Sequence, residues 1–243
     1  MLYPNINLFI ADKQIISIDW GIGLAWLYWG IWDPSTQVRI LHSPLTLNYI
    51  NSSNKLYNMK KIFMDFDGTL VNSRRGYCDA YSQLYANCEN YEHPNWKCVT
   101  EWELSKMCPL SKEDLFGHDL FFYDLEFMHG AKSKIESLST MFNIIICTIG
   151  SYDNISKKSQ WIKHRLPMIK KTIFINNGAN HLDKSIINMQ NSIMVDDVSN
   201  NLYSSNAEIK ICFGDEFIWN RDWEGTRCLN WSELYKELMK YKE

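Results

Sequence analysis

Five short apolar segments alternate with segments of helical character, and this alternation constrains the fold more than any other feature of the chain. Apolar runs of this length, closed by turn or polar residues, are typical of buried strands. The predicted strands cover residues 61–65, 143–148, 172–176, 192–196 and 209–213. Helices are predicted over residues 74–87, 131–138, 154–164 and 231–240, with a further helix opening at Ser111. Strands that alternate with helices form a parallel sheet, so the sequence predicts an α/β fold, a Rossmann-like sheet flanked by helices.

Polar side chains close three of these runs, at Asp65, Thr148 and Asp196. The carboxyl ends of parallel strands meet at one edge of the sheet, where ligands bind, so we expect the three side chains to lie close together. Asp67 and Asp197 bring two more carboxylates to this edge. Because buried carboxylates are costly unless positive charge meets them, and because hard oxygen ligands suit Mg²⁺, the sequence predicts a magnesium site.

Two further groups near this edge suit a phosphate. Thr148 offers a hydroxyl, and the backbone N–H groups beside it can also donate to phosphate oxygens. Lys184 precedes Asp196 by twelve residues and supplies the positive charge that a transferring phosphoryl group needs.

Charge and cysteine content narrow the possible partners and compartments. The formal net charge is -3, so the chain lacks the basic excess that a phosphate-tracking surface needs, and duplex nucleic acid is not an expected partner. Seven cysteines without a C-x-x-C pair argue against a zinc site and, with no secretory signal, indicate a reducing cytoplasm. The sequence leaves a homodimer open.

Residues 71–140 separate the first two predicted strands and are too long for one crossover. They predict a mainly helical cap inserted after the first strand, with a core domain formed by residues 59–70 and 141–243. Residues 1–58 form an N-terminal extension, for which three interpretations stay open. They are a strand pair or loosely packed appendage, a membrane contact through residues 15–32, and a misassigned upstream stretch before a domain that starts near Met59.

The segment DFDGTLV at 65–71 resembles the first motif, D-x-D-G-T-L/V, of the haloacid dehalogenase-like (HAD) phosphatases. The strand ending at Thr148, then Lys184, then Asp196-Asp197 are similar to the second, third and fourth motifs, in the same order. Outside the motifs, the chain from about residue 59 onward resembles the 5'(3')-deoxyribonucleotidase branch, including its phage and bacterial members. The stretches that carry this resemblance are FMHGAKSKIESL, KKSQWIKHRLP and DKSIINMQNSIMVDDVSNNL.

The resemblance implies a role for each motif residue. Asp65 would be the nucleophile that becomes an aspartyl-phosphate, and Asp67 the general acid and then the general base. Thr148 and Lys184 would hold the phosphate. Mg²⁺ would be bound by Asp65, the backbone carbonyl of Asp67 and Asp196, with Asp197 nearby.

The implied activity is Mg²⁺-dependent hydrolysis of a small phosphomonoester, most simply a deoxynucleoside monophosphate. Hydrolysis of a sugar phosphate and a non-catalytic HAD-fold binding protein are the alternatives. Arg74, Trp96 and Trp102 are candidate substrate contacts, through charge or by stacking on a base.

Two further groups of residues are interpreted as structural. Four lysines are interpreted as lying on solvated faces of helices or loops, although one of these lysines could attract substrate: Lys157, Lys158, Lys170 and Lys171. Three tryptophans near the C-terminus are read as packing on the core, with a ligand role as the alternative: Trp219, Trp223 and Trp231.

Overall fold

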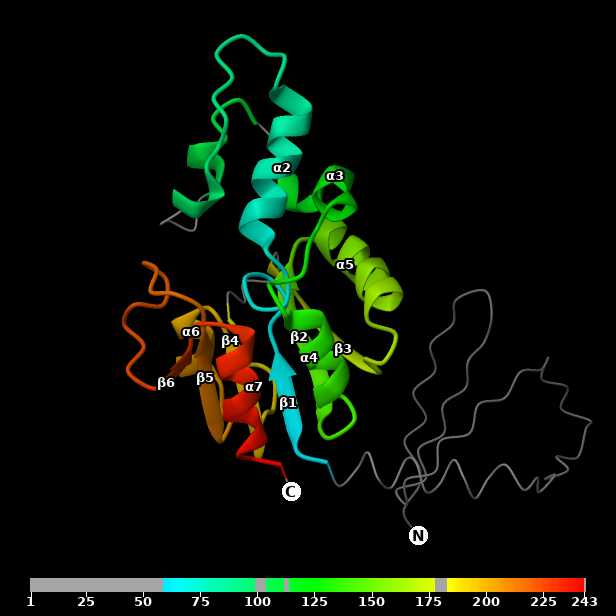
Figure 1. Ribbon diagram of the computed structural model, residues 1–243, viewed down its shortest axis with the longest axis vertical. Helices are drawn as coiled ribbons and strands as arrows, with labels where there is room; N and C mark the ends of the chain where they lie inside the picture. Colours follow the sequence, from blue (N-terminus) through cyan, green and yellow to red (C-terminus); the bar gives the residue numbers. More distant parts are fainter. Residues whose placement is uncertain (1–58, 99–103, 112–113, 178–182, 243) are drawn as a thin grey trace, which may run out of the picture. The chain divides into compact units, whose positions relative to one another are not determined.

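The computed structural model describes residues 59–98, 104–111, 114–177 and 183–242, which all belong to one compact unit of the chain. Within these residues six strands form one sheet in the order β3-β2-β1-β4-β5-β6, and every neighbouring pair is parallel (Figure 1). The strands are β1 (Lys61–Met64), β2 (Asn143–Gly150), β3 (Lys171–Asn176), β4 (Ser192–Asp196), β5 (Ile209–Phe213) and β6 (Thr226–Cys228). The predicted α/β fold is confirmed, and β6 is a strand that the sequence did not indicate.

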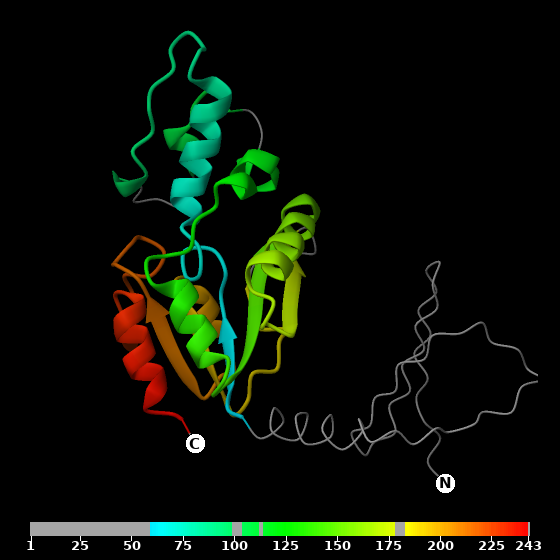
Figure 2. The ribbon, with the colours of Figure 1, turned by 45° about the vertical axis from the view of Figure 1, so that its right-hand side comes forward.

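Helices flank this sheet on both faces (Figure 2). The α-helices are α2 (Ser73–Tyr85), α3 (Asp119–Tyr123), α4 (Ala131–Leu138), α5 (Tyr152–Arg165), α6 (Ser199–Ser204) and α7 (Trp231–Met239). Short 3-10 helices are η1 (Trp96–Cys98), η2 (Leu104–Met107) and η3 (Leu115–Gly117).

Side chains that alternate along each strand build two separate cores. Ile62 and Met64 of β1 face one side and pack in a cluster with apolar residues of α4, α5 and α7. Phe63 faces the other side and packs in a smaller cluster with Leu202 of α6. Because the central strands are buried on both faces, they read as continuous apolar runs, which is why the sequence indicated them.

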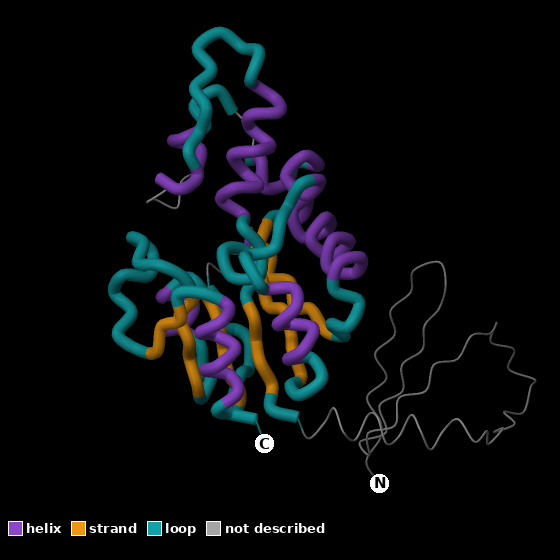
Figure 3. The backbone as a smooth tube through the Cα atoms, in the orientation of Figure 1, coloured by secondary structure: helices purple, strands orange, loops and turns teal. Residues whose placement is uncertain are grey.

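The part of the segment between β1 and β2 that contains α2 and α3 extends beyond the carboxyl edge of the sheet (Figures 1 and 3). Its two ends lie side by side, because the Asn72 N–H donates to the Glu126 carbonyl (2.9 Å) and the Met128 N–H donates to the Leu70 carbonyl (2.9 Å). α4 follows this pairing and packs against α7. The division into a cap at 71–140 and a core stays a prediction, and this packing favours an earlier end for the cap.

One predicted helix is wrong. Ser111 donates its N–H to the Cys108 carbonyl in a turn and opens no helix. Asp114 instead caps η3, its carboxylate accepting from the Phe116 N–H at 3.1 Å. The acidic residue is therefore itself the helix cap, and not the third residue after a serine cap.

The extension at 1–58, with the apolar run at 15–32, lies outside the described residues. In the part of the chain that the structure does describe, no helix has the length and apolar character needed to cross a bilayer.

Candidate active site

Two carboxylates at the carboxyl edge of the sheet share one buried lysine. The ammonium of Lys184 lies 2.5 Å from Oδ1 of Asp65 and 2.6 Å from Oδ2 of Asp196. The lysine is 1% exposed and Asp196 is fully buried. The convergence that the sequence predicted for these three residues is therefore present in the structure.

The strand ends explain how residues so distant in the chain meet. The Asp65 N–H donates to the Val195 carbonyl at 2.9 Å, which continues the β1–β4 pairing one residue past β1 and sets Asp65 beside Asp196. The chain then turns at Gly68, whose φ of 71° is left-handed. A Cβ at this position would overlap the carboxylate of Asp197, so glycine lets the loop approach the fourth motif closely.

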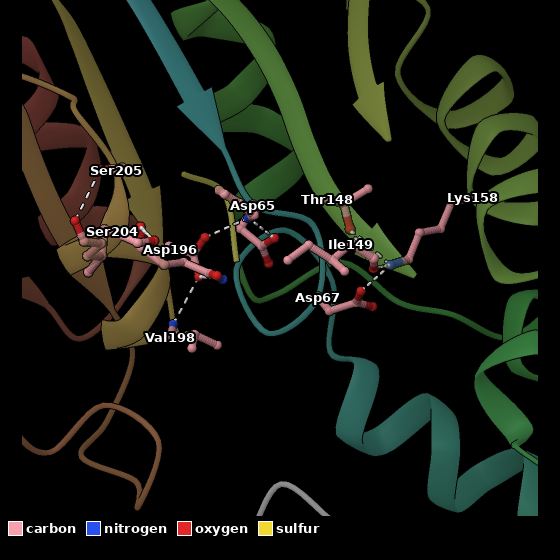
Figure 4. Close-up of polar contacts among 12 residues, drawn as sticks. Asp65, Asp67, Thr148, Ile149, Lys158, Asp196, Val198, Ser204 and Ser205 are labelled. Carbon is pink, nitrogen blue, oxygen red and sulfur yellow. Dashed lines mark hydrogen bonds and ion pairs between the residues drawn. The ribbon is translucent and has the colours of Figure 1, made fainter. Parts of the chain in front are cut away.

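Asp196 is held by donors on both of its oxygens. Oδ1 accepts from the Val198 N–H (3.0 Å) and from the Asn201 amide (3.1 Å), while Oδ2 faces Lys184 (Figure 4). Burial nevertheless raises the pKa of Asp196 to about 6, against the lowering effect of Lys184. For Lys184, burial opposes the charged form, but the charges of Asp196 and Asp65 outweigh it and raise its pKa.

A second buried lysine serves Asp67. Lys158 of α5 forms an ion pair with Oδ2 of Asp67 and donates to the Thr148 hydroxyl at 2.9 Å and the Ile149 carbonyl at 3.0 Å (Figure 4). Burial raises the pKa of Asp67, and the charge of Lys158 acts in the opposite direction. Lys158 therefore links Asp67 of the first motif to Thr148 of the second motif.

The interpretation of Lys158 as part of a solvated face is wrong, because the residue is 1% exposed. A signal for its burial was present in the sequence. Asn154, Lys158, Trp161 and Ile162 recur at helical spacing and form the buried face of α5. A lysine on the buried face of a helix needs a partner for its charge, and here that partner is Asp67.

Four of the motif residues, Asp65, Asp67, Thr148 and Asp197, line a cavity of about 500 Å³, a volume within the range of small-molecule sites. Its walls come from the strand ends, the start of α5, the η3 loop and the loop after β5. The lining residues include Asp65, Asp67, Thr148, Lys158, Asp197, Phe116 and Trp219. A larger open groove of about 670 Å³ lies over α2 and the 123–127 segment, and it contains none of the motif residues.

The carboxylates fit a divalent cation. Asp65, Asp196 and Asp197 each place a carboxylate oxygen within 4.8 Å of the other two. Oδ1 of Asp67 and Oδ1 of Asp197 are buried without a hydrogen-bond partner, and burial together with the charges of Asp65 and Asp196 raises the pKa of Asp197 well above its ordinary value. With all four carboxylates ionised, the two lysines would leave two negative charges, which one divalent ion would balance.

The predicted substrate contacts fall in different places. Arg74 lies over the Phe217 ring at 4.2 Å and lines a small pocket with Asp197 and Trp219, next to the main cavity. Trp96 belongs to η1 and does not line the cavity described above. Trp102 lies outside the described residues.

A family comparison decides what this site belongs to. The profile of the family "5' nucleotidase, deoxy (Pyrimidine), cytosolic type C protein" matches residues 58–243, which is most of the chain and contains all four motifs. The chain belongs to this family. It is a phosphomonoester hydrolase of the 5'-nucleotidase type, and the motif resemblance noted in the sequence is confirmed at this level.

Individual relatives agree with the family assignment. A 5'(3')-deoxyribonucleotidase from Clostridium acetobutylicum is 26% identical over 193 residues, covering 71% of this chain and 95% of the relative. Among solved structures, a predicted phosphatase from the same organism has a TM-score of 0.55 at 13% identity, covering 75% of this chain and 99% of that one. A Bacillus subtilis structure described as a HAD-hydrolase, YfnB, bound to magnesium has a TM-score of 0.50 at 13% identity, with coverages of 74% and 98%. These structures show that the chain has the HAD fold.

Proposed function

We propose that this protein hydrolyses deoxynucleoside monophosphates in a Mg²⁺-dependent reaction, through a phosphorylated aspartate at position 65. The observation that carries the proposal is the pairing of Asp65 and Asp196 with one buried lysine, Lys184, where Asp65 lines a substrate-sized cavity. A carboxylate attacks a phosphate poorly because both are anions, so catalysis requires positive charge to be fixed in place beforehand.

The first half-reaction follows from the contacts of Asp65. Its Oδ1 pairs with Lys184, so Oδ2 is the oxygen that we propose attacks phosphorus. The new Oδ2–P bond forms as the bond between phosphorus and the ester oxygen breaks. Lys184, the Thr148 hydroxyl and the backbone N–H groups after it would hold the phosphoryl oxygens. Asp65, the backbone carbonyl of Asp67, Asp196 and Asp197 would hold Mg²⁺, which would supply the remaining positive charge.

Asp67 is the residue that we propose as general acid and then as general base. Burial raises its pKa and so favours the protonated form that can donate to the leaving oxygen of the nucleoside. In the second half-reaction the resulting carboxylate takes a proton from water as the water oxygen bonds to phosphorus and the Oδ2–P bond breaks. We propose that Lys158 fixes the direction of this carboxylate, since it also contacts Thr148 and the Ile149 carbonyl.

The cysteines and the family description support a compartment for the reaction. All seven cysteines are free thiols, of which five are buried. Burial raises the pKa of Cys147 within β2 to about 11, so this cysteine is an inert packing residue. Free thiols suit a reducing compartment, and the family is of the cytosolic type. We place the reaction in the cytoplasm.

A substrate panel tests the proposal. Purified protein is assayed for phosphate release from deoxynucleoside 5'- and 3'-monophosphates, deoxyribose 5-phosphate and other sugar phosphates, with Mg²⁺ and with excess chelator. We expect the highest kcat/KM on a deoxynucleotide and no turnover with chelator or in the folded Asp65→Asn variant. Preference for a sugar phosphate would overturn the substrate class. Metal binding without turnover of any compound would support a binding protein instead.

A further inference from the structure

The loop between β5 and β6 brings one aromatic side chain to the catalytic cavity. Trp219 lines the cavity together with Asp65, Asp67 and Asp197, and its indole N–H donates to Oδ2 of Asp197 at 3.3 Å. The residue also lines the adjoining small pocket that contains Arg74. Trp219 therefore stands beside the fourth motif, in the same space that would receive a substrate.

Several contacts hold this tryptophan in one orientation. Its ring stacks on Phe217, with centroids 4.6 Å apart and an interplanar angle of 10°, and the Arg74 guanidinium lies 4.2 Å from the Phe217 centroid. The Trp219 carbonyl accepts from the Ser199 N–H (3.1 Å) and the Ser199 hydroxyl (3.0 Å). A side chain ordered in advance loses little conformational freedom when a ligand binds to it.

A buried asparagine fixes the rest of the loop. Asn220 is fully buried, and its amide nitrogen donates to the carbonyls of Asp197 (2.9 Å) and Asp215 (3.2 Å). Its side-chain oxygen accepts from the Phe217 N–H at 2.9 Å. The loop is thus tied to the residues that follow β4, so the aromatic pair keeps a constant position relative to the carboxylates.

We infer that Trp219 is a specificity-determining residue, on whose indole the nucleobase of the substrate stacks while the phosphate sits at Asp65. The inference rests on the proposed function. A phosphate at the strand ends leaves the organic part of the molecule to occupy the rest of the cavity, where Trp219 and Phe116 are the aromatic residues among the described lining residues. A fixed planar ring recognises a base through its face, which tolerates different bases.

The test compares two substrates that share the phosphate and the sugar but differ in the base. Thymidine 5'-monophosphate and deoxyribose 5-phosphate are assayed with Mg²⁺ on the full chain and on Trp219→Leu, Trp219→Phe and Trp223→Leu. Stacking of a base is worth about 1–3 kcal/mol, so Trp219→Leu should lower kcat/KM for the nucleotide by about 5- to 150-fold, mainly through KM. The sugar phosphate should change by less than about threefold.

The two other variants separate stacking from alternative roles. Trp219→Phe keeps a stacking face but loses the hydrogen bond to Asp197, so it should retain most of the preference for the nucleotide. Trp223→Leu is the matched control, because Trp223 lies in the same loop but packs against Tyr203, with ring centroids 4.9 Å apart and tilted by 55°, and is not a cavity residue. It should leave the ratio of the two kcat/KM values unchanged.

Four results would overturn the inference. Equal losses on both substrates in Trp219→Leu would mean that the indole supports the metal site or the fold. Equal losses in the Leu and Phe variants would mean that the hydrogen bond to Asp197 carries the effect. Unchanged kcat/KM values for both substrates in Trp219→Leu would refute this inference alone, whereas a wild-type preference for deoxyribose 5-phosphate would overturn the proposed substrate class as well.

Discussion

The carboxyl edge of the sheet and the segment inserted between β1 and β2 contribute to the same cavity in different ways. The sheet edge supplies buried charges in fixed pairs, such as Lys184 with Asp196 and Lys158 with Asp67. The inserted segment supplies Phe116 and Asp114 on a short loop, and its own aromatic residues mostly pack against one another, as Tyr77 does with Phe116. In the mechanism that we propose, the chemistry therefore uses side chains at the strand ends, while substrate recognition uses the loops that lie over them.

Removing the charge of Lys184 should give the largest effect. Lys184→Met leaves two buried carboxylates without their shared cation, so we expect about a 100- to 1,000-fold loss in kcat. The free energy of unfolding in chelator should fall by about 3–5 kcal/mol, and Mg²⁺ should restore part of it. Activity assays and denaturant unfolding with and without Mg²⁺ measure both quantities.

The control for this variant is Lys60→Met, which breaks only the surface ion pair with Glu208. Equal effects of the two variants on kcat would contradict the assignment of Lys184 to the site.

Removing Lys158 should give an intermediate effect that depends on the leaving group. Lys158→Met frees the carboxylate of Asp67 to turn, so kcat for a nucleotide should drop by about 10- to 100-fold, a part of what acid catalysis contributes. Hydrolysis of p-nitrophenyl phosphate, whose leaving group needs little protonation, should suffer much less. Steady-state kinetics on both substrates checks this prediction.

Lys157→Met is the matched control, since Lys157 is next in the chain but contacts the Gly117 carbonyl and Asp119 instead. If Lys158→Met slowed both substrates to the same extent, Lys158 would support the fold of α5 and would not orient Asp67.

The smallest effect is expected from a substitution at the contact between the core and the inserted segment. The buried Asn154 of α5 donates its amide to the Phe116 carbonyl at 2.6 Å, which ties the η3 loop to the core. Asn154→Ala should cost about 1 kcal/mol of unfolding free energy and raise KM more than it lowers kcat. Asn188→Ala, at an exposed turn, should change neither; an Asn154→Ala variant with unchanged KM would show that the loop does not shape the substrate site.

The same contrast explains how far the sequence could predict the structure. Apolar runs ending in Asp65, Thr148 and Asp196 predicted both the parallel sheet and the edge at which these side chains meet, because strand order and direction follow from few rules. Lys184 was identified through its motif. The three strand-end side chains are encoded locally, each by an apolar run and the residue that closes it, and Lys184 by its place in the order of the motifs.

Features that depend on contacts between distant loops were not predicted. Lys158 was read as solvated because its partner, Asp67, lies 91 residues away in the chain. Trp219 reaches the cavity only because Asn220 and Ser199 tie its loop to the end of β4, which no periodicity reveals. The three-residue strand β6 is too short to stand out as an apolar run.

Asp65 is the residue that we propose receives the phosphoryl group, and acid quenching during turnover detects such a phosphorylated intermediate most directly. Protein mixed with Mg²⁺ and a deoxynucleoside monophosphate carrying radiolabelled phosphate is quenched during turnover, digested and mapped. We expect an acid-stable, base-labile label on the peptide that contains Asp65, and no label in Asp65→Asn. Turnover without a labelled protein species, or a label on any other residue, would contradict it.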